Sequence, residues 1–137
     1  MTNSFHNDLY DSGLSVITDA ASAGTLRLVL CSAAPTTRAE AATLHDGGVS
    51  KYRLTGEHSL GSGDVTLGDR TGGGREITVD AVVDTIMVTL AAGSDLHFAL
   101  YDTTRLLYVG DETSDQALTN GNPINYPSFK FGFSSVA

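Results

Sequence analysis

The fold is decided by residues 96–109, LHFALYDTTRLLYV, in which two apolar runs flank a short polar link. In the first run a large apolar side chain recurs at every second position, with His97 on the polar face. A period of two is the spacing at which side chains share one face of a β-strand. The link at residues 102–104, DTT, is short enough for a hairpin turn before the returning run RLLYV. The stretch therefore predicts an antiparallel hairpin.

Similar patterns continue on both sides of this hairpin. Residues 76–81, EITVDA, and 86–90, IMVTL, alternate apolar with polar side chains, which predicts half-buried strands with one polar face. Residues 128–133, SFKFGF, place three phenylalanines on one face of a last strand. Turn signals separate these runs about every ten residues, a spacing typical of an antiparallel β-sandwich or barrel-like domain. They lie at residues 61–63, 71–74, 92–94, 102–104 and 120–121.

The first third of the chain adds a short N-terminal helix and a buried strand. Apolar residues at helical spacing predict a helix over residues 7–21, closed by Gly24, and its apolar stripe either covers its own sandwich or docks on a neighbour. Residues 25–33, TLRLVLCSA, read as a strand buried on both faces, and residues 35–44 as a connection with a threonine-capped helical turn. We expect one mainly β domain over residues 1–137, with an arm and helix in 1–24 and a β-sandwich in 25–137. The helix pattern rests on Leu9, Tyr10, Leu14, Val16 and Ile17.

The composition of the chain indicates which classes of partner and which cellular compartment to expect. With 137 residues, 41% of them hydrophobic, the chain can build a core. A net charge of −8 argues against a nucleic acid or an anionic membrane as the partner. Cys31 is the one cysteine, so the chain cannot form an internal disulfide, which suits synthesis in a reducing cytoplasm. The sequence shows no signal-peptide pattern and no apolar run of roughly 18 residues, so we expect neither export nor membrane insertion.

The stretch 68–80, GDRTGGGREITVD, raises the question of a phosphate-binding loop. Such a loop needs glycines that precede a helix, because the free N–H groups of the helix N-terminus hold the anion. Here the glycines lead into a strand, and no lysine follows them. We therefore expect a loop at the edge of the sandwich, with Arg70 and Arg75 as solvated or subunit-bridging charges.

The remaining reactive side chains form no recognisable motif. The histidines are scattered without zinc spacing, and the acids near turns lack the calcium-loop pattern. Cys31 follows an apolar run, where a thiol serves packing, and an acidic cluster after residue 109 reads as a hairpin tip facing water rather than a pair of glycosidase acids. We expect no catalytic residue, no cofactor and no metal, and hence no enzyme. The residues weighed were His6, His45, His58, His97, Asp46, Asp64, Asp69, Asp111, Glu112 and Asp115.

The order of these segments resembles small virion proteins of tailed bacteriophages, several of which are head decoration or cement proteins encoded near the major capsid protein. The likeness lies in DSGLSVI at residues 11–17, LCSAAPTTRAEA at 30–41 and GGGREITVD at 72–80. Its most specific part is 99–127, where ALYDTTRLLYV is followed by QALTNGNPINYP. The resemblance implies a β-rich protein that forms a homo-oligomer, most often a trimer, on the exterior of a capsid. It implies no catalytic residues.

Three functions from different classes follow. A cement protein would bridge subunits of the major capsid protein on the virion exterior, after synthesis in the host cytoplasm. A tail or receptor-binding module would contact the host surface, although the tyrosines that could stack on sugars look like core or interface residues. An enzyme would need a deep pocket with shifted acids or bases. The sequence favours the first, and the tyrosines concerned are Tyr10, Tyr52, Tyr101, Tyr108 and Tyr126.

The alternation also predicts the composition of the core. The three phenylalanines of residues 128–133 should face the interior of the sandwich, because period-two spacing places all of them on one face. Their expected neighbours come from the other strands. The expected set is Phe129, Phe131 and Phe133 with Leu28, Ile77, Val79, Val88, Phe98 and Leu100.

Overall fold

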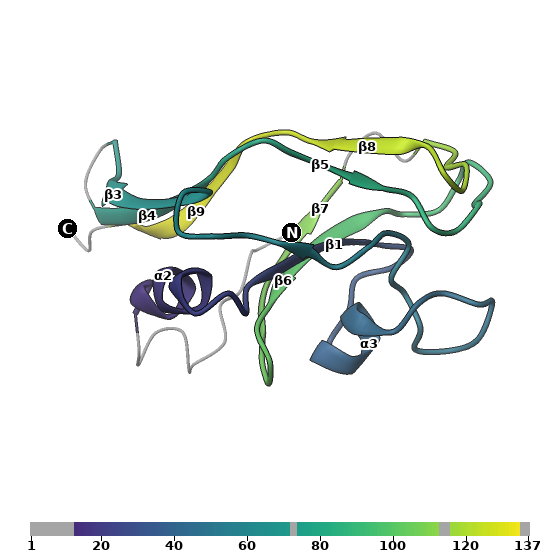
Figure 1. The fold of residues 1–137 in the computed structure, drawn as a ribbon, viewed down its shortest axis with the longest axis horizontal. Helices are drawn as coiled ribbons and strands as arrows, with labels where there is room; N and C mark the ends of the chain where they lie inside the picture. Colours follow the sequence, from purple (N-terminus) through teal and green to yellow (C-terminus); the bar gives the residue numbers. More distant parts are fainter. Residues whose placement is uncertain (1–12, 72–73, 113–115, 135–137) are drawn as a thin grey trace.

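A computed structural model describes residues 13–71, 74–112 and 116–134 of the chain. It is mainly β, with antiparallel sheets and a short helix near the N-terminus, so the predicted fold class is confirmed (Figure 1). The described elements are α2 (Ser15–Ser22), β1 (Arg27–Cys31), α3 (Arg38–Ala42), β2 (His58–Ser59), β3 (Val65–Asp69), β4 (Gly74–Val79), β5 (Val82–Thr85), β6 (His97–Tyr101), β7 (Leu106–Asp111), β8 (Pro123–Tyr126) and β9 (Phe129–Ser134).

A four-stranded antiparallel sheet in the order β2-β1-β6-β7 forms one layer. Strand β1 pairs with β6 along its whole length, from Arg27 opposite Tyr101 to Cys31 opposite His97. The predicted hairpin is confirmed, since β6 continues into β7 through the turn at residues 102–105. Strand β1 is also buried on both faces, as its apolar run predicts.

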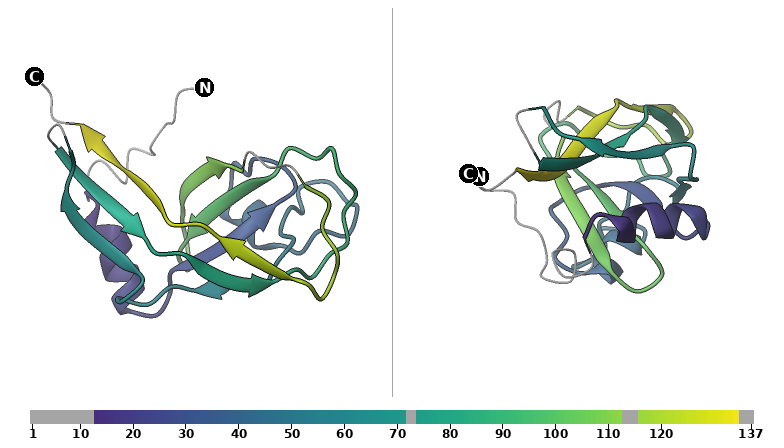
Figure 2. Two further views of the ribbon diagram at one scale, coloured as in Figure 1. Left: turned by 90° about the horizontal axis from the view of Figure 1, so that it is seen from above. Right: turned by 90° about the vertical axis from the view of Figure 1, so that its left-hand side faces the viewer.

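A long two-stranded ribbon forms the second layer. Strands β4 and β5 run along one side of it, and β9 and β8 run antiparallel to them along the other. The ladder is interrupted at residues 80–81 and 127–128, and β3 adds a third strand at the β4 end. Figure 2 shows this ribbon crossing the four-stranded sheet, with α2 below its three-stranded end.

The main core lies between the two layers, and most of the predicted core residues are in it. Phe131 is buried, with its ring stacked on Tyr108 at a centroid distance of 4.3 Å. Phe129 is half-buried against Phe98, whose ring centroid lies 4.6 Å away. The side chain of Phe133 lies outside the described residues. The other predicted members, Leu28, Ile77, Val79, Val88 and Leu100, are buried or packed against the same cluster.

The second face of the four-stranded sheet is covered as well. Val29 and Ala99 point away from the ribbon and are fully buried with Ala41 of α3. Thr37 caps α3, since its hydroxyl accepts a hydrogen bond from the Glu40 N–H at 3.2 Å, as the sequence predicted. The connection between β1 and β2 is therefore a packed layer, and the sheet has no solvent-facing side around β1.

Helix α2 covers one end of its own domain. It buries Val16, Ile17, Ala20 and Ala21 and contacts β3. Of the predicted helix over residues 7–21, the part with Leu9 and Tyr10 lies outside the described residues. Gly24 follows the helix with a φ of +75°, a conformation that favours glycine, so the predicted stop is confirmed.

Two strand predictions need correction. Residues 76–81 were expected to form one strand, but β4 ends at Val79, and Ala81 is exposed where the ribbon is interrupted. The expected strand at 86–90 is wrong: only isolated bridges occur there, at Ile86 and Leu90, and the strand is β5 just before it. The reason is pairing, because β8 offers its hydrogen-bonding groups to residues 82–85.

Replacing Phe131 with alanine should lower the free energy of unfolding by roughly 3–5 kcal/mol, because the change leaves a cavity beside Tyr108. Denaturant unfolding measures the loss. Lys130→Ala is the control: this neighbour is exposed, and its ammonium group pairs with the Glu76 carboxylate across the strands at 3.4 Å. A loss below about 1 kcal/mol for Phe131→Ala would show that the ring does not support the core.

Candidate functional site

The glycine stretch does not form an anion site in its described part. Residues 72–73 lie outside the described residues, and the flanking segments are the antiparallel strands β3 and β4. A strand, not a helix, follows the glycines, as the sequence predicted. Arg75 donates a hydrogen bond to Asp69 at 2.7 Å on the surface, and Arg70 is exposed. The stretch therefore turns the chain between two strands.

Cys31 has a structural environment. Its side chain is fully buried on the outer face of β1, with Val29 and Tyr101 in the same cluster. Burial raises the pKa of the thiol to about 12, since the low-dielectric surroundings disfavour the thiolate. A protonated, inaccessible thiol is a packing group rather than a nucleophile.

Several of the histidines and turn acids weighed from the sequence lie in separate parts of the fold. His45 Nδ1 lies 2.9 Å from the Lys51 carbonyl oxygen, and Lys51 pairs with Asp46 at 2.8 Å. His58 on β2 lies 3.6 Å from Asp84 on β5. These contacts hold loops and strands together, while Asp64 accepts a hydrogen bond from the Gly61 N–H at 2.8 Å. His6 and Asp115 lie outside the described residues.

A network of polar and charged side chains joins residues 38–57, the outer layer of the domain, to the four-stranded sheet. The Tyr101 hydroxyl donates to Glu57 Oε2 at 2.7 Å, and the Arg38 guanidinium lies 5.0 Å from the centre of the Tyr101 ring. Burial raises the pKa of Tyr101, and the hydrogen bond to the negatively charged Glu57 raises it further. The phenol therefore stays protonated. Arg53 donates to the carbonyl oxygens of Ala42 and Thr55. Each of these contacts either joins two residues of the 38–57 segment or joins that segment to Tyr101 of β6.

Asp102 organises the turn between β6 and β7. Its carboxylate accepts hydrogen bonds from the N–H groups of Thr104 and Arg105 and pairs with the Arg105 guanidinium at 2.7 Å. Burial alone would raise the pKa of Asp102, but these hydrogen bonds and the guanidinium together outweigh burial and lower it. Asp102 is therefore a turn-forming carboxylate, which the sequence had marked only as part of a turn.

Asp102→Asn should lower the free energy of unfolding at pH 7 by about 1–3 kcal/mol, because a charged acceptor is replaced by a neutral one. A lowered pKa in the folded state means that the stabilisation is present above the unfolded value, about 3.9, and is lost as the pH falls below it. The difference between wild type and variant should therefore shrink below about pH 4. Urea unfolding at several pH values measures it, with the exposed Asp69→Asn as control; a constant difference down to pH 2 would contradict this role.

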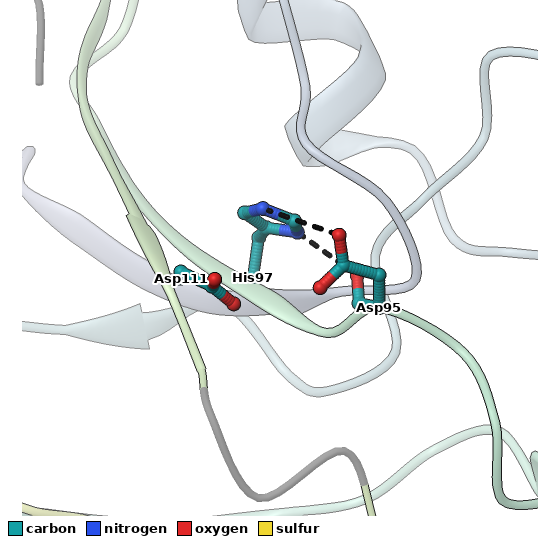
Figure 3. Close-up of side chains that lie close together, drawn as sticks. All are labelled: Asp95, His97 and Asp111. Carbon is teal, nitrogen blue, oxygen red and sulfur yellow. Dashed lines mark hydrogen bonds and ion pairs between the residues drawn. The ribbon is translucent and has the colours of Figure 1, made fainter. Parts of the chain in front are cut away.

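The structure brings together three residues that the sequence left apart: Asp95, His97 and Asp111. One candidate ligand atom from each lies within 4.8 Å of the others. Figure 3 shows the His97 ring between the two carboxylates, with Asp95 from the loop before β6 and Asp111 from the end of β7. The expected polar-face position of His97 is wrong, since the residue is 6% exposed. Asp111 is exposed at a strand end, as expected, whereas Glu112 is half-buried and its N–H donates to the Leu96 carbonyl oxygen at 2.9 Å.

A β-bulge creates this cluster. In the β6–β7 hairpin Tyr101 lies opposite Leu106 and Leu100 opposite Tyr108, so Leu107 is an extra residue on β7. The shift by one residue places Asp111, rather than Gly110, opposite His97, so both side chains are on the same face. Sequence reasoning missed the pair because the alternation does not show where a bulge falls. The one sequence feature that pointed toward the cluster was the spacing Asp95-x-His97 at the start of the strand.

A cavity lies on the other side of the same strand end. It has a volume of about 240 Å³ and a mainly apolar lining that includes Leu30, Phe98 and Tyr126, with Asp111 and Glu112 at its edge. Typical small-molecule sites run from about 300 to 1,000 Å³, so this cavity is small for a substrate. Phe98 fills the adjacent space by lying over Gly110, where a Cβ atom would come within 2.4 Å of the ring.

The outer face of the β5–β8 ribbon carries an uncharged surface, the ribbon strip, formed by Val83, Thr85, Met87, Pro123 and Asn125. Val83 lies opposite Asn125, and Thr85 lies opposite Pro123, so each pair shares a face. Val83 is 57% exposed and Met87 42% exposed. Arg53 borders the strip, with its guanidinium 3.8 Å from the Met87 sulfur.

Comparison with known proteins finds no match to a family model, to a curated protein or to a solved structure. Within residues 13–71, 74–112 and 116–134, the structure contains no helix of the length and apolarity that a membrane span requires.

Proposed function

We propose that this protein is a structural virion component that decorates a bacteriophage capsid and stabilises it by bridging subunits of the major capsid protein. In this proposal it acts as a homo-oligomer, a trimer by the resemblance of its sequence to cement proteins. The observation that carries the proposal is the ribbon strip: a chain with a net charge of −8 leaves one strand face free of charged side chains.

The composition of the ribbon strip supports a contact function. The centres of protein interfaces are distinguished from the remaining surface mainly by depletion of charged residues, and methionine is enriched in them. Val83 supplies exposed apolar area on a paired strand, and Met87 adds exposed apolar area just beyond the end of β5. The branched Val83 side chain has few rotamers to lose when a partner covers it. A cement protein gains its energy from such surfaces and needs no reacting group.

The titratable groups also favour contact over catalysis. Among the described residues, those with shifted pKa values are held in structural roles, as in the Tyr101–Glu57 hydrogen bond and the Asp102 turn. An enzyme would place such groups around a substrate-sized cleft. The cavity of about 240 Å³ between the layers is instead lined mainly by core residues.

The direct test compares phage particles with and without the protein during heating. A cement protein binds only the assembled shell, so its presence should raise the temperature at which DNA is released. Equal release temperatures, together with loss of host adsorption when the protein is absent, would contradict the proposal and favour a tail or receptor-binding module.

A matched pair of variants connects the test to the ribbon strip. Val83→Asp adds a charge to the strip at an exposed position, whereas Thr66→Asp adds the same charge at an exposed position on β3. Val83→Asp should reduce the occupancy of purified particles and remove the thermal protection, because an unpaired charge must be desolvated on binding. Thr66→Asp should retain both. Equal behaviour of the two variants would show that the strip is not the contact.

A further inference from the structure

We propose that Asp95, His97 and Asp111 bind a divalent transition metal ion of the zinc and manganese class. This inference does not depend on the proposed capsid function, since it rests on a separate part of the surface. The three residues supply one imidazole nitrogen and two carboxylates from neighbouring positions of the β6–β7 hairpin.

The separation of the ligand atoms fits a site that closes around an ion. Ligands at 2.0–2.2 Å from zinc lie roughly 3.4 Å from one another in tetrahedral geometry. The candidate ligand atoms here lie within 4.8 Å of one another, so side-chain movements on the order of 1 Å bring them to the separation that zinc requires. Asp95 can make this movement, because its side chain is 72% exposed and has rotational freedom.

The histidine is the fixed member of the set. Its side chain is only 8% exposed, and its Nδ1 lies 2.9 Å from the Asp95 carbonyl oxygen. A carbonyl oxygen can only accept, so Nδ1 carries the proton and donates it, which leaves the Nε2 lone pair free in the neutral ring. Histidines that bind metals characteristically donate the other ring N–H to a carboxylate or a backbone carbonyl in this way.

The free nitrogen faces negative charge. Nε2 lies 4.0 Å from Asp95 Oδ2, which is too long for a hydrogen bond, and it forms none with any residue of the described part of the chain. Two carboxylates beside an imidazole nitrogen that has no hydrogen-bond partner among the described residues concentrate negative charge, which favours a cation next to them. A divalent ion satisfies all three groups at once, since two carboxylates balance its charge.

The types of ligand select the class of ion. Calcium and magnesium prefer oxygen ligands alone, whereas imidazole favours zinc, copper, iron or nickel, and carboxylates extend the range to manganese. A set of one nitrogen and two carboxylates therefore suits zinc or manganese better than calcium. Three protein ligands also leave a coordination position for water.

Binding would join the loop before β6 to the end of β7. Asp111 is the last residue of β7, and Asp95 precedes the first residue of β6. The ion would therefore close the open end of the hairpin, opposite the turn that Asp102 organises at its other end. An ion that binds only the folded chain stabilises it by mass action.

The experiment uses the untagged full chain, freed of metal with a chelator, and measures zinc binding by calorimetry and thermal unfolding. Wild type should bind one zinc ion and unfold at a higher temperature with zinc than without it. Asp111→Asn and Asp95→Asn remove one charged ligand each at exposed positions, and each should weaken zinc binding by at least about tenfold. Asp80→Asn is the matched control, because it makes the same change at an exposed position outside the cluster and should bind as wild type does.

A spectroscopic readout tests the role of the imidazole. Cobalt in place of zinc should give visible absorption bands of a nitrogen- and oxygen-ligated ion in wild type and in Asp80→Asn, and not in His97→Gln. Absence of one-to-one zinc binding below about 1 mM in wild type would overturn the proposal. Unchanged zinc affinity in both aspartate variants would also overturn it. Calcium binding tighter than zinc binding would do the same, because it would indicate a site formed by the carboxylates without the histidine.

Discussion

The fold depends on the burial of β1 on both faces. Leu28 and Leu30 point toward the ribbon, Val29 points toward α3, and each is at most 1% exposed. A strand of this kind is stable only if the sheet is covered on both sides, because exposure of either face would return large apolar side chains to water. The ribbon and α2 cover one face, and the 38–57 segment covers the other. The Tyr101–Glu57 hydrogen bond and the Arg53 contacts hold that segment in place.

This arrangement restricts where the protein can act. Among the described residues, both sides of the central sheet are covered around β1, and the cavity lined by Leu30, Phe98 and Tyr126 is small. Both surfaces that we propose to be functional accordingly lie at the rim and on the outside of the domain. The Asp95–His97–Asp111 cluster lies where β6 begins and β7 ends, and the ribbon strip lies on the face of β5 and β8 that points away from the core. Neither surface requires the core to open.

Local patterns in the sequence predicted much of the fold. The alternation in residues 96–109 gave the hairpin, the apolar run at 25–33 gave a doubly buried strand, and Thr37 capped its helix, because each feature is determined by neighbours in the chain. The features that depend on distant pairing were not predictable. Strand β5 is fixed by β8, some forty residues later. The alternation at 86–90 misled because it resembles a strand, although in the described part of the chain the segment makes only isolated bridges and has no continuous partner strand. The Asp95–His97–Asp111 cluster needs the bulge at Leu107, which no periodicity reveals.

Native-state hydrogen exchange of the β1 amides tests most directly whether the outer layer is a fixed part of the fold rather than a lid over a hidden site. Leu30 and Leu54 are joined by a backbone hydrogen bond of 2.8 Å, so exchange there requires the 38–57 segment to separate from the sheet. The account predicts that amides in β1 and β6 and at Leu54 exchange with one common free energy, equal to that of global unfolding in denaturant. Exchange at Leu54 with a free energy several kcal/mol lower, while β6 stays protected, would contradict the account, because it would show an outer layer that opens on its own.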